Sequence, residues 1–289
     1  MSGTVTRPEL ARALAALAGP SPEAEVCRLV GLPPPPGAAA HTEVFLLETH
    51  PYASVHLGAE GMIGGDAGDR VAGFWRALGM VPPTEPDHLR TLLELYACLG
   101  VEELAFPLDD RRRSAVRSAR AGLLWEHLAP WVPVHLATVD RVGDGFHRAW
   151  ASLALDVLSA EADALPARAE LPTALGDAPP PLGIGSRREL VDAVLTPARS
   201  GMVITQADLV RAGGDLGLGV RRGERRFALE GLLDQHPAAV LAWLAALAAE
   251  WSGLHGRWHR GALEPVGKWW AARARGAAEV LADAVRTAA

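Results

Sequence analysis

Four short stretches of the sequence carry residue types and spacings that occur in functional sites. They are a Gly-rich run GAEGMIGGDAGD (58–69), the pair Asp87–His88, the pair His255–His259, and an Arg- and Trp-rich run (257–276). The corresponding chemistries are phosphate binding, recognition of a partner, metal coordination, and binding of nucleic acid or another anion. The residues around each stretch decide between these functions and ordinary packing.

The Gly-rich run resembles a phosphate-binding loop in composition only. A P-loop continues into Gly-Lys-Ser or Gly-Lys-Thr and follows a β-strand, and the sequence around this run provides neither feature. A helical protein that binds a nucleotide or a pterin through this loop is therefore kept as an alternative hypothesis, behind the main prediction developed below.

His255 and His259 are four residues apart, which is the spacing of two metal ligands on one face of a helix. No Cys, Glu or third His completes a ligand set at a recognised spacing, and Gly256 and Gly261 weaken the helical pattern. We therefore expect these two histidines to lie on the surface and predict no metal site.

The run 257–276 mixes arginines with Trp258, Trp269 and Trp270, a combination that binds nucleic acid in other proteins. Tryptophans spaced in this way, with Leu263 and Val266 between them, are more typical of packing, so we predict no nucleic-acid partner. The motifs His-Glu-x-x-His and Gly-x-Ser-x-Gly do not occur in the sequence, which leaves metalloprotease and serine-hydrolase chemistry without support. We find no motif that identifies catalytic residues and predict no cofactor.

Composition predicts an all-α protein with an acidic region. Of the 289 residues 49% are hydrophobic, with many Ala and Leu, and no long alternation of apolar and polar residues predicts strands. Residues 43–110 contain twelve Asp and Glu and three Arg, a balance of −9, although the whole chain has a net charge of −6. After residue 110 there are 22 basic and 19 acidic residues, a balance of +3. The uneven distribution favours a cationic partner for the region 43–110.

The sequence also favours a cytoplasmic protein. The N-terminal stretch lacks a basic segment ahead of an unbroken apolar core, so it does not predict a signal peptide. No run of about 18 uncharged apolar residues predicts a membrane span. Cys27 and Cys98 each lie in an apolar helical pattern, as expected for core thiols in a reducing compartment.

Helical patterns punctuated by Pro and Gly predict a bundle of roughly ten helices. Up to residue 165 they form a helical core, 166–186 is a Pro- and Gly-rich linker or long loop, and 187–289 is a helical C-terminal part. Within the last part we expect helices near 187–196, 205–212, 224–235, 237–252 and 265–287. The sequence leaves open whether this part packs on the core or extends from it.

The pair Asp87–His88 precedes a helix with one apolar stripe, formed by Leu89, Leu92, Leu93, Tyr96 and Leu99. One interpretation is capping by Thr84 or Asp87, with His88 solvated. The other is that the pair faces a partner. Spacing alone does not separate these two interpretations.

Four stretches, in order, resemble a known family. They are PYASVHLGAEGMIGG (51–65), FWRALGM (74–80), EPDHLRTLLELYACL (85–99) and LLWEHLAPWVPVH (123–135). This arrangement is similar to that of the TorD/DmsD group of redox-enzyme maturation chaperones, which includes the NarJ-type proteins. The chain departs from the family pattern at residues 95–98 and at Leu123, where one apolar residue replaces another, and at His56, where the family often has Tyr.

The resemblance implies a TorD-like, all-helical core over residues 1–165 and a cytoplasmic chaperone without catalytic turnover. Its partner would be a molybdopterin-containing oxidoreductase, whose N-terminal signal peptide, often a twin-arginine one, is held back from export during cofactor insertion. Asp87 and His88 match the family positions implicated in recognising this peptide. A NarJ-like chaperone, whose client lacks a twin-arginine leader, is an alternative that the sequence does not exclude. Either a monomer or a homodimer is compatible with it.

A twin-arginine leader offers two guanidinium groups followed by an apolar, helix-prone segment. Its receptor needs carboxylates for the first and an apolar groove for the second. We therefore expect two groups of peptide-binding residues. The polar group is Asp87, His88, Glu94 and Glu48, and the aromatic group is Tyr52, Trp75, Trp125 and Trp131.

Overall fold

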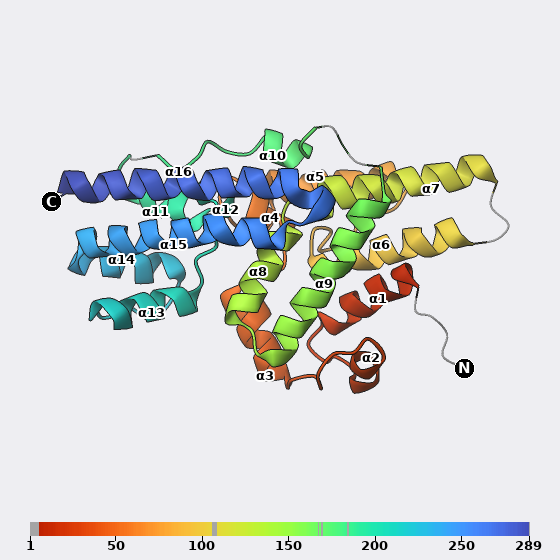
Figure 1. Cartoon of the computed structure of the whole chain (residues 1–289), viewed down its shortest axis with the longest axis horizontal. Coiled ribbons are helices and arrows are strands. Elements are labelled where there is room, and N and C mark those ends of the chain that lie inside the picture. Colours follow the sequence, from red (N-terminus) through yellow and green to blue (C-terminus); the bar gives the residue numbers. More distant parts are fainter. Residues whose placement is uncertain (1–5, 106–108, 167, 169, 184, 289) are drawn as a thin grey trace.

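The structure is a computed structural model and describes residues 6–105, 109–166, 168, 170–183 and 185–288. Every named element in these ranges is helical, and the β-type pairing found there is one isolated bridge between Tyr52 and His88. The predicted all-α fold is thereby confirmed (Figure 1).

In the described residues of the N-terminal half there are eleven elements, including two π-helical segments, η1 and η2. They are α1 (Arg7–Leu17), α2 (Ala24–Leu29), α3 (Ala38–His41), η1 (Thr42–Glu48), α4 (Ala53–Leu57), α5 (Gly65–Ala77), α6 (Leu89–Leu104), α7 (Asp110–Gly122), η2 (Leu123–Leu128), α8 (Val132–Val142) and α9 (Gly145–Ala164). All five residues of the predicted α6 stripe are buried, and α6 packs against α1 and α7. Because burial of one Leu side chain contributes about 1.5–3 kcal/mol, this stripe is a main source of stability for the half.

The C-terminal half begins with the segment that was predicted to be a linker. Its elements are α10 (Thr173–Gly176), α11 (Arg187–Leu195), α12 (Pro197–Ser200), α13 (Gln206–Leu216), α14 (Arg225–Gln235), α15 (Pro237–Trp258), η3 (Gly261–Leu263) and α16 (Glu264–Ala288). The described part of 166–186 is anchored, because Leu175 and Leu182 are buried and Leu182 N donates to Arg199 O over 2.9 Å.

Helices α15 and α16 form a long antiparallel pair (Figure 1). Gly201 allows α12 to approach α16 closely, since its φ is +71° and a Cβ there would lie 2.2 Å from Ala274 N. Helix α15 is also long and apolar enough to span a membrane, with a mean hydropathy of 1.3. Its side chains Leu244, Ala248 and Trp251 are fully buried in the protein, as in a core helix.

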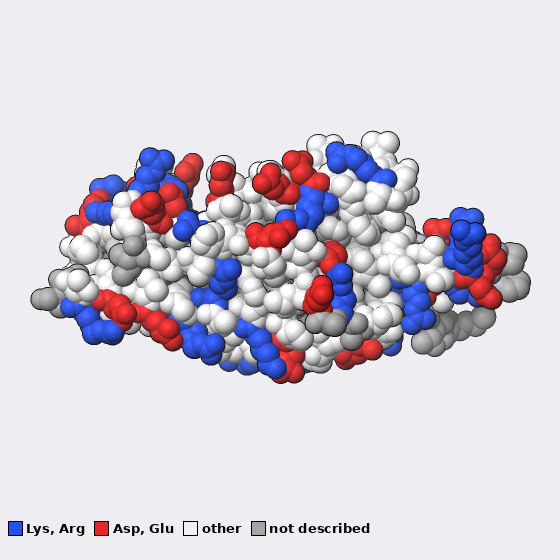
Figure 2. All heavy atoms as spheres, turned by 90° about the horizontal axis from the view of Figure 1, so that it is seen from above, with Lys and Arg blue, Asp and Glu red and all other residues white. Residues whose placement is uncertain are grey.

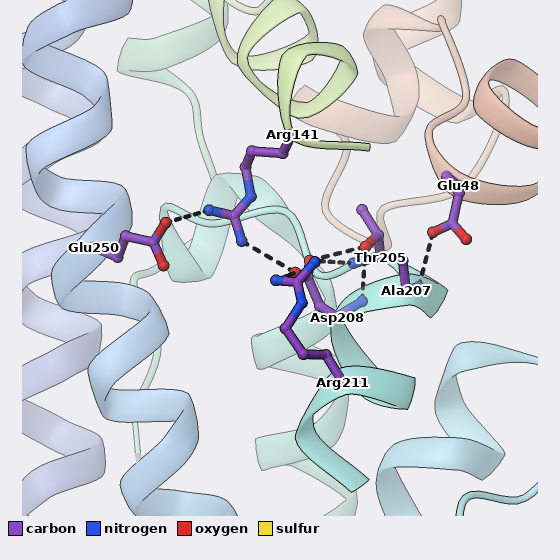
Figure 3. A network of polar contacts seen from close by, with 7 residues as sticks. All are labelled: Glu48, Arg141, Thr205, Ala207, Asp208, Arg211 and Glu250. Carbon is purple, nitrogen blue, oxygen red and sulfur yellow. Dashed lines mark hydrogen bonds and ion pairs between the residues drawn. The ribbon is translucent and has the colours of Figure 1, made fainter. Parts of the chain in front are cut away.

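A polar network joins the C-terminal helices to the N-terminal half (Figure 3). Arg141 of α8 pairs with Asp208 of α13 over 3.0 Å and also with Glu250 of α15. Burial disfavours the charged form of Arg141, but the two carboxylates outweigh this effect and raise its pKa. Glu48 of η1 accepts a hydrogen bond from Ala207 N, in the first turn of α13, over 3.0 Å. The C-terminal helices therefore pack on the core.

Candidate functional site: an acidic groove beside the Gly-rich loop

Two hollows lie on either side of the Gly-rich loop and share the lining residues Ile63, Gly64 and Gly65. The first, which we call the acidic hollow, measures about 870 Å³ and is lined by Tyr52, Ile63–Gly65, Gly68, Asp69, Ala72, Arg76 and 82–87. The second measures about 960 Å³ and is lined by Leu57–Glu60, Met62–Ala67, Arg70, Ala174, Asp177 and Pro179. Together they form what we call the loop groove, and their size suits a peptide or a small molecule.

Asp87 lies at the base of the acidic hollow with 3% of its surface exposed. Its Oδ2 accepts a hydrogen bond from Ser54 N over 2.9 Å, and its backbone oxygen accepts one from Ala53 N over 3.1 Å. Both donors belong to the first turn of α4, so Asp87 satisfies amides that the helix leaves free. Asp87 thus positions α4, and a ligand meets its carboxylate only from inside the hollow.

His88 is the N-cap of α6, because its Nδ1 accepts a hydrogen bond from Arg90 N over 3.1 Å. Neither Thr84 nor Asp87 caps this helix, and the half-buried His88 is not the solvated residue that the capping interpretation assumed. Burial lowers the pKa of His88, although the carboxylates of Glu85 and Asp87 oppose this shift. Its ring stands edge-on to Tyr52, with the ring centres 4.8 Å apart.

Glu85 and Asp69 add two carboxylates to the lining of the acidic hollow. Glu85 is exposed and accepts a hydrogen bond from Tyr52 Oη over 2.6 Å, whereas Asp69 comes from α5. Within the described ranges no Lys, Arg or His lies within 4.0 Å of the carboxylates of Asp69, Glu85 or Asp87 as an ion-pair partner. The fold therefore leaves the negative charge of this hollow without a paired cation. Sequence reasoning missed both acids as site residues, although they belong to the acidic excess of 43–110.

The other two carboxylates predicted to face a peptide lie outside the lining of the loop groove. Glu94 is on the exposed face of α6 and pairs with Arg90 over 2.9 Å. Glu48 binds the first turn of α13, as described above. Peptide contact by these two residues stays a prediction.

Trp75, Trp125 and Trp131 are core residues in this conformation, with 8%, 5% and 0% of their surfaces exposed. Their indole N–H groups donate to the backbone oxygens of Pro86 (3.3 Å), Pro166 (3.1 Å) and His127 (2.7 Å), respectively. None of the three lines the loop groove. Trp75 acts on it indirectly, by holding the segment that carries Asp87, and direct contact of these indoles with a peptide stays a prediction.

The Gly-rich loop gives the groove an apolar edge. Gly64 N donates to Ser54 Oγ over 3.0 Å, and the backbone φ angles of Gly61, Gly64 and Gly65 are positive, at 62°, 91° and 69°. Side chains at these positions would be strained. The loop exposes 65% of Met62 and 57% of Ile63. The acids that line the groove outnumber its two arginines, Arg70 and Arg76, so its net negative charge disfavours a phosphate group and weakens the nucleotide hypothesis.

The expectation of surface histidines at 255 and 259 is wrong. Helix α15 continues through Gly256 to Trp258, and the exposed fractions of His255 and His259 are 0% and 2%. Packing of α16 against this face buries both rings, which the two glycines did not prevent. A group of three or more His, Cys, Asp or Glu side chains placed to hold a metal does not occur in the described part of the chain.

The surface gives no sign of a nucleic-acid site on the face that Figure 2 shows. Acidic and basic side chains alternate over that face, and no extended basic area appears. The tryptophans of the Arg- and Trp-rich run pack as expected, since Trp270 is fully buried and donates from Nε1 to Pro130 O over 2.7 Å.

Residues 37–137 match the model of a protein family described as nitrate reductase delta subunit. The match covers about a third of the chain, and this segment is similar to that family. The match confirms the relationship to NarJ- and TorD-like proteins that the four stretches between residues 51 and 135 predicted. Neither the curated proteins nor the solved structures contain a match to this chain. Every residue lining the acidic hollow lies within the matched segment.

Proposed function

We propose that the protein is a cytoplasmic assembly chaperone for a molybdopterin-containing oxidoreductase, and that the loop groove holds the N-terminal signal peptide of this client before export. The family match supports the chaperone class. The signal-peptide part of the proposal depends on one observation, the three carboxylates of the acidic hollow that have no ion-pair partner in the described chain.

The two parts of a twin-arginine leader correspond to the two surfaces of the groove. Its guanidinium groups bind Asp69 and Glu85 at the walls of the acidic hollow, with Asp87 at the base. The apolar segment that follows them packs along Met62 and Ile63 of the loop. Paired guanidinium and carboxylate groups form directed, charge-assisted hydrogen bonds, which explains a preference for Arg over Lys.

The remaining residues of the site position these groups. Tyr52 orients Glu85 through its hydroxyl, His88 fixes the start of α6, and Asp87 fixes the start of α4. Because the walls of the acidic hollow are open to solvent, we expect its ion pairs to be screened and individually weak. A modest grip suits a chaperone that must release its client, and binding changes no covalent bond.

Calorimetry with the leader peptide of the client enzyme tests this proposal. We expect the double variant Asp69→Asn/Glu85→Gln to bind at least tenfold more weakly than the wild type. The matched control Glu25→Gln/Glu279→Gln removes the same charge from exposed sites outside the groove and is expected to bind as the wild type does. Equal affinity of the two double variants would remove the acidic hollow from the peptide site. A leader with Lys in place of both Arg is expected to bind more weakly to the wild type.

A second candidate function is supported by the description of the matched family, nitrate reductase delta subunit. On this hypothesis the protein assembles a client that has no twin-arginine leader. A pull-down with the apoenzyme, with and without its N-terminal segment, separates the two: loss of binding on truncation supports the leader proposal, and full retention supports the NarJ-like one.

A further inference from the structure

Two buried histidines between α15 and α16 have no part in the proposed function. His255 and His259 both line a hollow of about 750 Å³ between the two helices, together with Ser252, Gly256, Arg260, Gly261, Glu264, Gly267, Lys268 and Ala271. A Cβ atom at Gly267 would lie 2.4 Å from His259 Cβ, so glycine is required for α16 to approach this ring. The hollow lies outside the segment that matches the chaperone family.

The hydrogen bonds of the two rings define their tautomers. His255 Nε2 lies 2.7 Å from Gly201 O, and His259 Nδ1 lies 2.8 Å from His255 O. A carbonyl oxygen only accepts, so each of these two nitrogens carries the proton. In the neutral rings the other nitrogens, His255 Nδ1 and His259 Nε2, therefore bear lone pairs.

These two lone-pair nitrogens are buried and have no hydrogen-bond partner in the structure. Buried polar atoms without a partner are rare in folded proteins and call for an explanation. A neutral imidazole that donates its N–H to a carbonyl and leaves its second nitrogen free has the orientation found in metal-bound histidines. Both rings have this arrangement.

The spacing of the rings is compatible with one shared ion. Zinc binds imidazole nitrogen at about 2.0–2.1 Å, which places each ring centre about 3.2 Å from the metal and two ring centres at most about 6.4 Å apart. The observed distance between the two ring centres is 5.7 Å. His255 lies in the last turn of α15 and His259 is the C-cap residue of this helix, and both line the same hollow.

We propose that His255 and His259 form a two-histidine binding site for a divalent transition-metal ion, such as Zn²⁺ or Co²⁺, between α15 and α16. Imidazole nitrogen favours this class of ion over Mg²⁺ and Ca²⁺, which prefer oxygen ligands. The carboxylate of Glu264, on the same hollow, pairs with Lys268 over 2.7 Å. Water or a donor from a bound protein therefore supplies the remaining ligands.

Two variants separate the free nitrogens from the hydrogen bonds that hold the rings. His255→Gln keeps a donor at the place of Nε2 and loses Nδ1, and His259→Asn keeps a donor at the place of Nδ1 and loses Nε2. Titration of tag-free protein with Zn²⁺ by calorimetry, and with Co²⁺ by visible absorption, measures binding. We expect one equivalent of metal in the wild type and a loss of affinity of about tenfold or more in each variant. His236→Asn, at an exposed histidine that caps the same helix, is the matched control and is expected to bind as the wild type does.

Thermal unfolding gives a second measurement. Because a ligand that binds only the folded state raises the melting temperature, Zn²⁺ is expected to stabilise the wild type and the His236→Asn control, but not the His255→Gln/His259→Asn double variant. Wild-type protein that binds neither ion at millimolar concentration overturns the proposal, whether or not the variants fold. Binding that persists unchanged in the folded double variant overturns it as well.

Discussion

Asp208 and Asp87 are equally buried, each with 3% of its surface exposed, but their electrostatic surroundings differ. Asp208 lies at the junction of the two halves, 3.0 Å from Arg141 and 3.3 Å from Arg211 (Figure 3). Asp87 lies at the base of the acidic hollow and binds backbone amide N–H of Ser54, with no ion-pair partner within the described part of the chain.

This difference shows how the fold uses its acidic residues. Where it joins elements, carboxylates meet arginines, as in Glu102–Arg112 and Glu103–Arg120 between α6 and α7. In the acidic hollow Asp69, Glu85 and Asp87 have no ion-pair partner in the described part of the chain, so part of the charge excess of residues 43–110 stays unpaired there. Although Asp87 and Glu85 accept hydrogen bonds within the fold, no ion pair neutralises their negative charge, which favours a cationic ligand.

The largest expected effect is the loss of stability when Asp208, the ion-paired aspartate, is replaced. Asp208→Ala removes the partner of the largely buried Arg141 and also the capping box of α13, in which Thr205 and Asp208 bond each other. Loss of one member of a buried ion pair costs about 3–5 kcal/mol. Urea unfolding is therefore expected to show a decrease of this size in the free energy of unfolding. The Asp69→Asn/Glu85→Gln variant is expected to remain within about 0.5 kcal/mol of the wild type. Comparable losses in the two variants would contradict the distinction between paired and unpaired carboxylates.

The next effect is the pH dependence of stability that arises from His56 in α4, the helix below the groove. His56 lies in α4, is 1% exposed, and has its pKa lowered by burial from 6.5 to about 3. Below pH 6.5 the unfolded chain therefore binds a proton at this residue while the folded protein does not. As the pH falls, this group lowers the free energy of unfolding by about 1.4 kcal/mol per pH unit. The stabilisation is complete above pH 6.5 and is lost progressively toward pH 3.

His56→Phe isolates this contribution. Between pH 7 and pH 5 the wild type is expected to lose about 2 kcal/mol more of its unfolding free energy than the variant does. Denaturant titrations at the two pH values check the prediction. Parallel losses in the two proteins would show that His56 is not held neutral, and that α4 is less tightly packed beneath the groove than the structure indicates.

A smaller effect is expected from salt. The carboxylates of the acidic hollow face solvent, so raising the ionic strength from about 0.05 M to about 0.5 M is expected to weaken leader-peptide binding about tenfold. The Asp69→Asn/Glu85→Gln variant is expected to show a much flatter dependence. Calorimetry at the two salt concentrations measures both slopes. A salt-independent affinity in the wild type would indicate that burial of the apolar segment against Met62 and Ile63 provides nearly all of the binding.

The helices and buried faces that depend on periodicity along the chain could be predicted from the sequence. Hydrogen bonds and burial that depend on tertiary contacts could not. The stripe on α6, the helices near 237–252 and 265–287, and the packing role of Trp270 follow from spacing along one helix. The hydrogen bond by which Asp87 caps α4 joins it to Ser54, 33 positions earlier, and no local sequence pattern predicts this contact. The expected exposure of His255 and His259 was wrong for the same reason, since α16 covers them from outside their own helix.

Within the candidate site, residue type pointed to a region of the chain but did not identify the individual residues that line the acidic hollow. The acidic excess of 43–110 drew attention to the region, but it did not distinguish Glu94, which is paired with Arg90, from Asp69 and Glu85, which have no ion-pair partner in the described structure. Trp75 was predicted to contact the ligand because it is aromatic, although its indole N–H serves to hold Pro86. Only the three-dimensional structure shows which of the carboxylates already have ion-pair partners.

The smallest expected effect tests how firmly the fold holds one unpaired carboxylate in place. Burial, followed by the nearby Glu85 carboxylate, raises the pKa of Tyr52, so its hydroxyl stays protonated and donates to Glu85 Oε1 over 2.6 Å. Tyr52→Phe keeps the ring against His88 but removes this bond, at a cost of about 1 kcal/mol in unfolding free energy. Glu85 then retains its charge but loses its orientation, so peptide affinity is expected to fall only two- to fivefold, less than in Asp69→Asn/Glu85→Gln. An unchanged affinity in calorimetry would show that charge alone matters at this wall, whereas a loss as large as that of the double variant would assign the tyrosine hydroxyl a direct contact with the peptide.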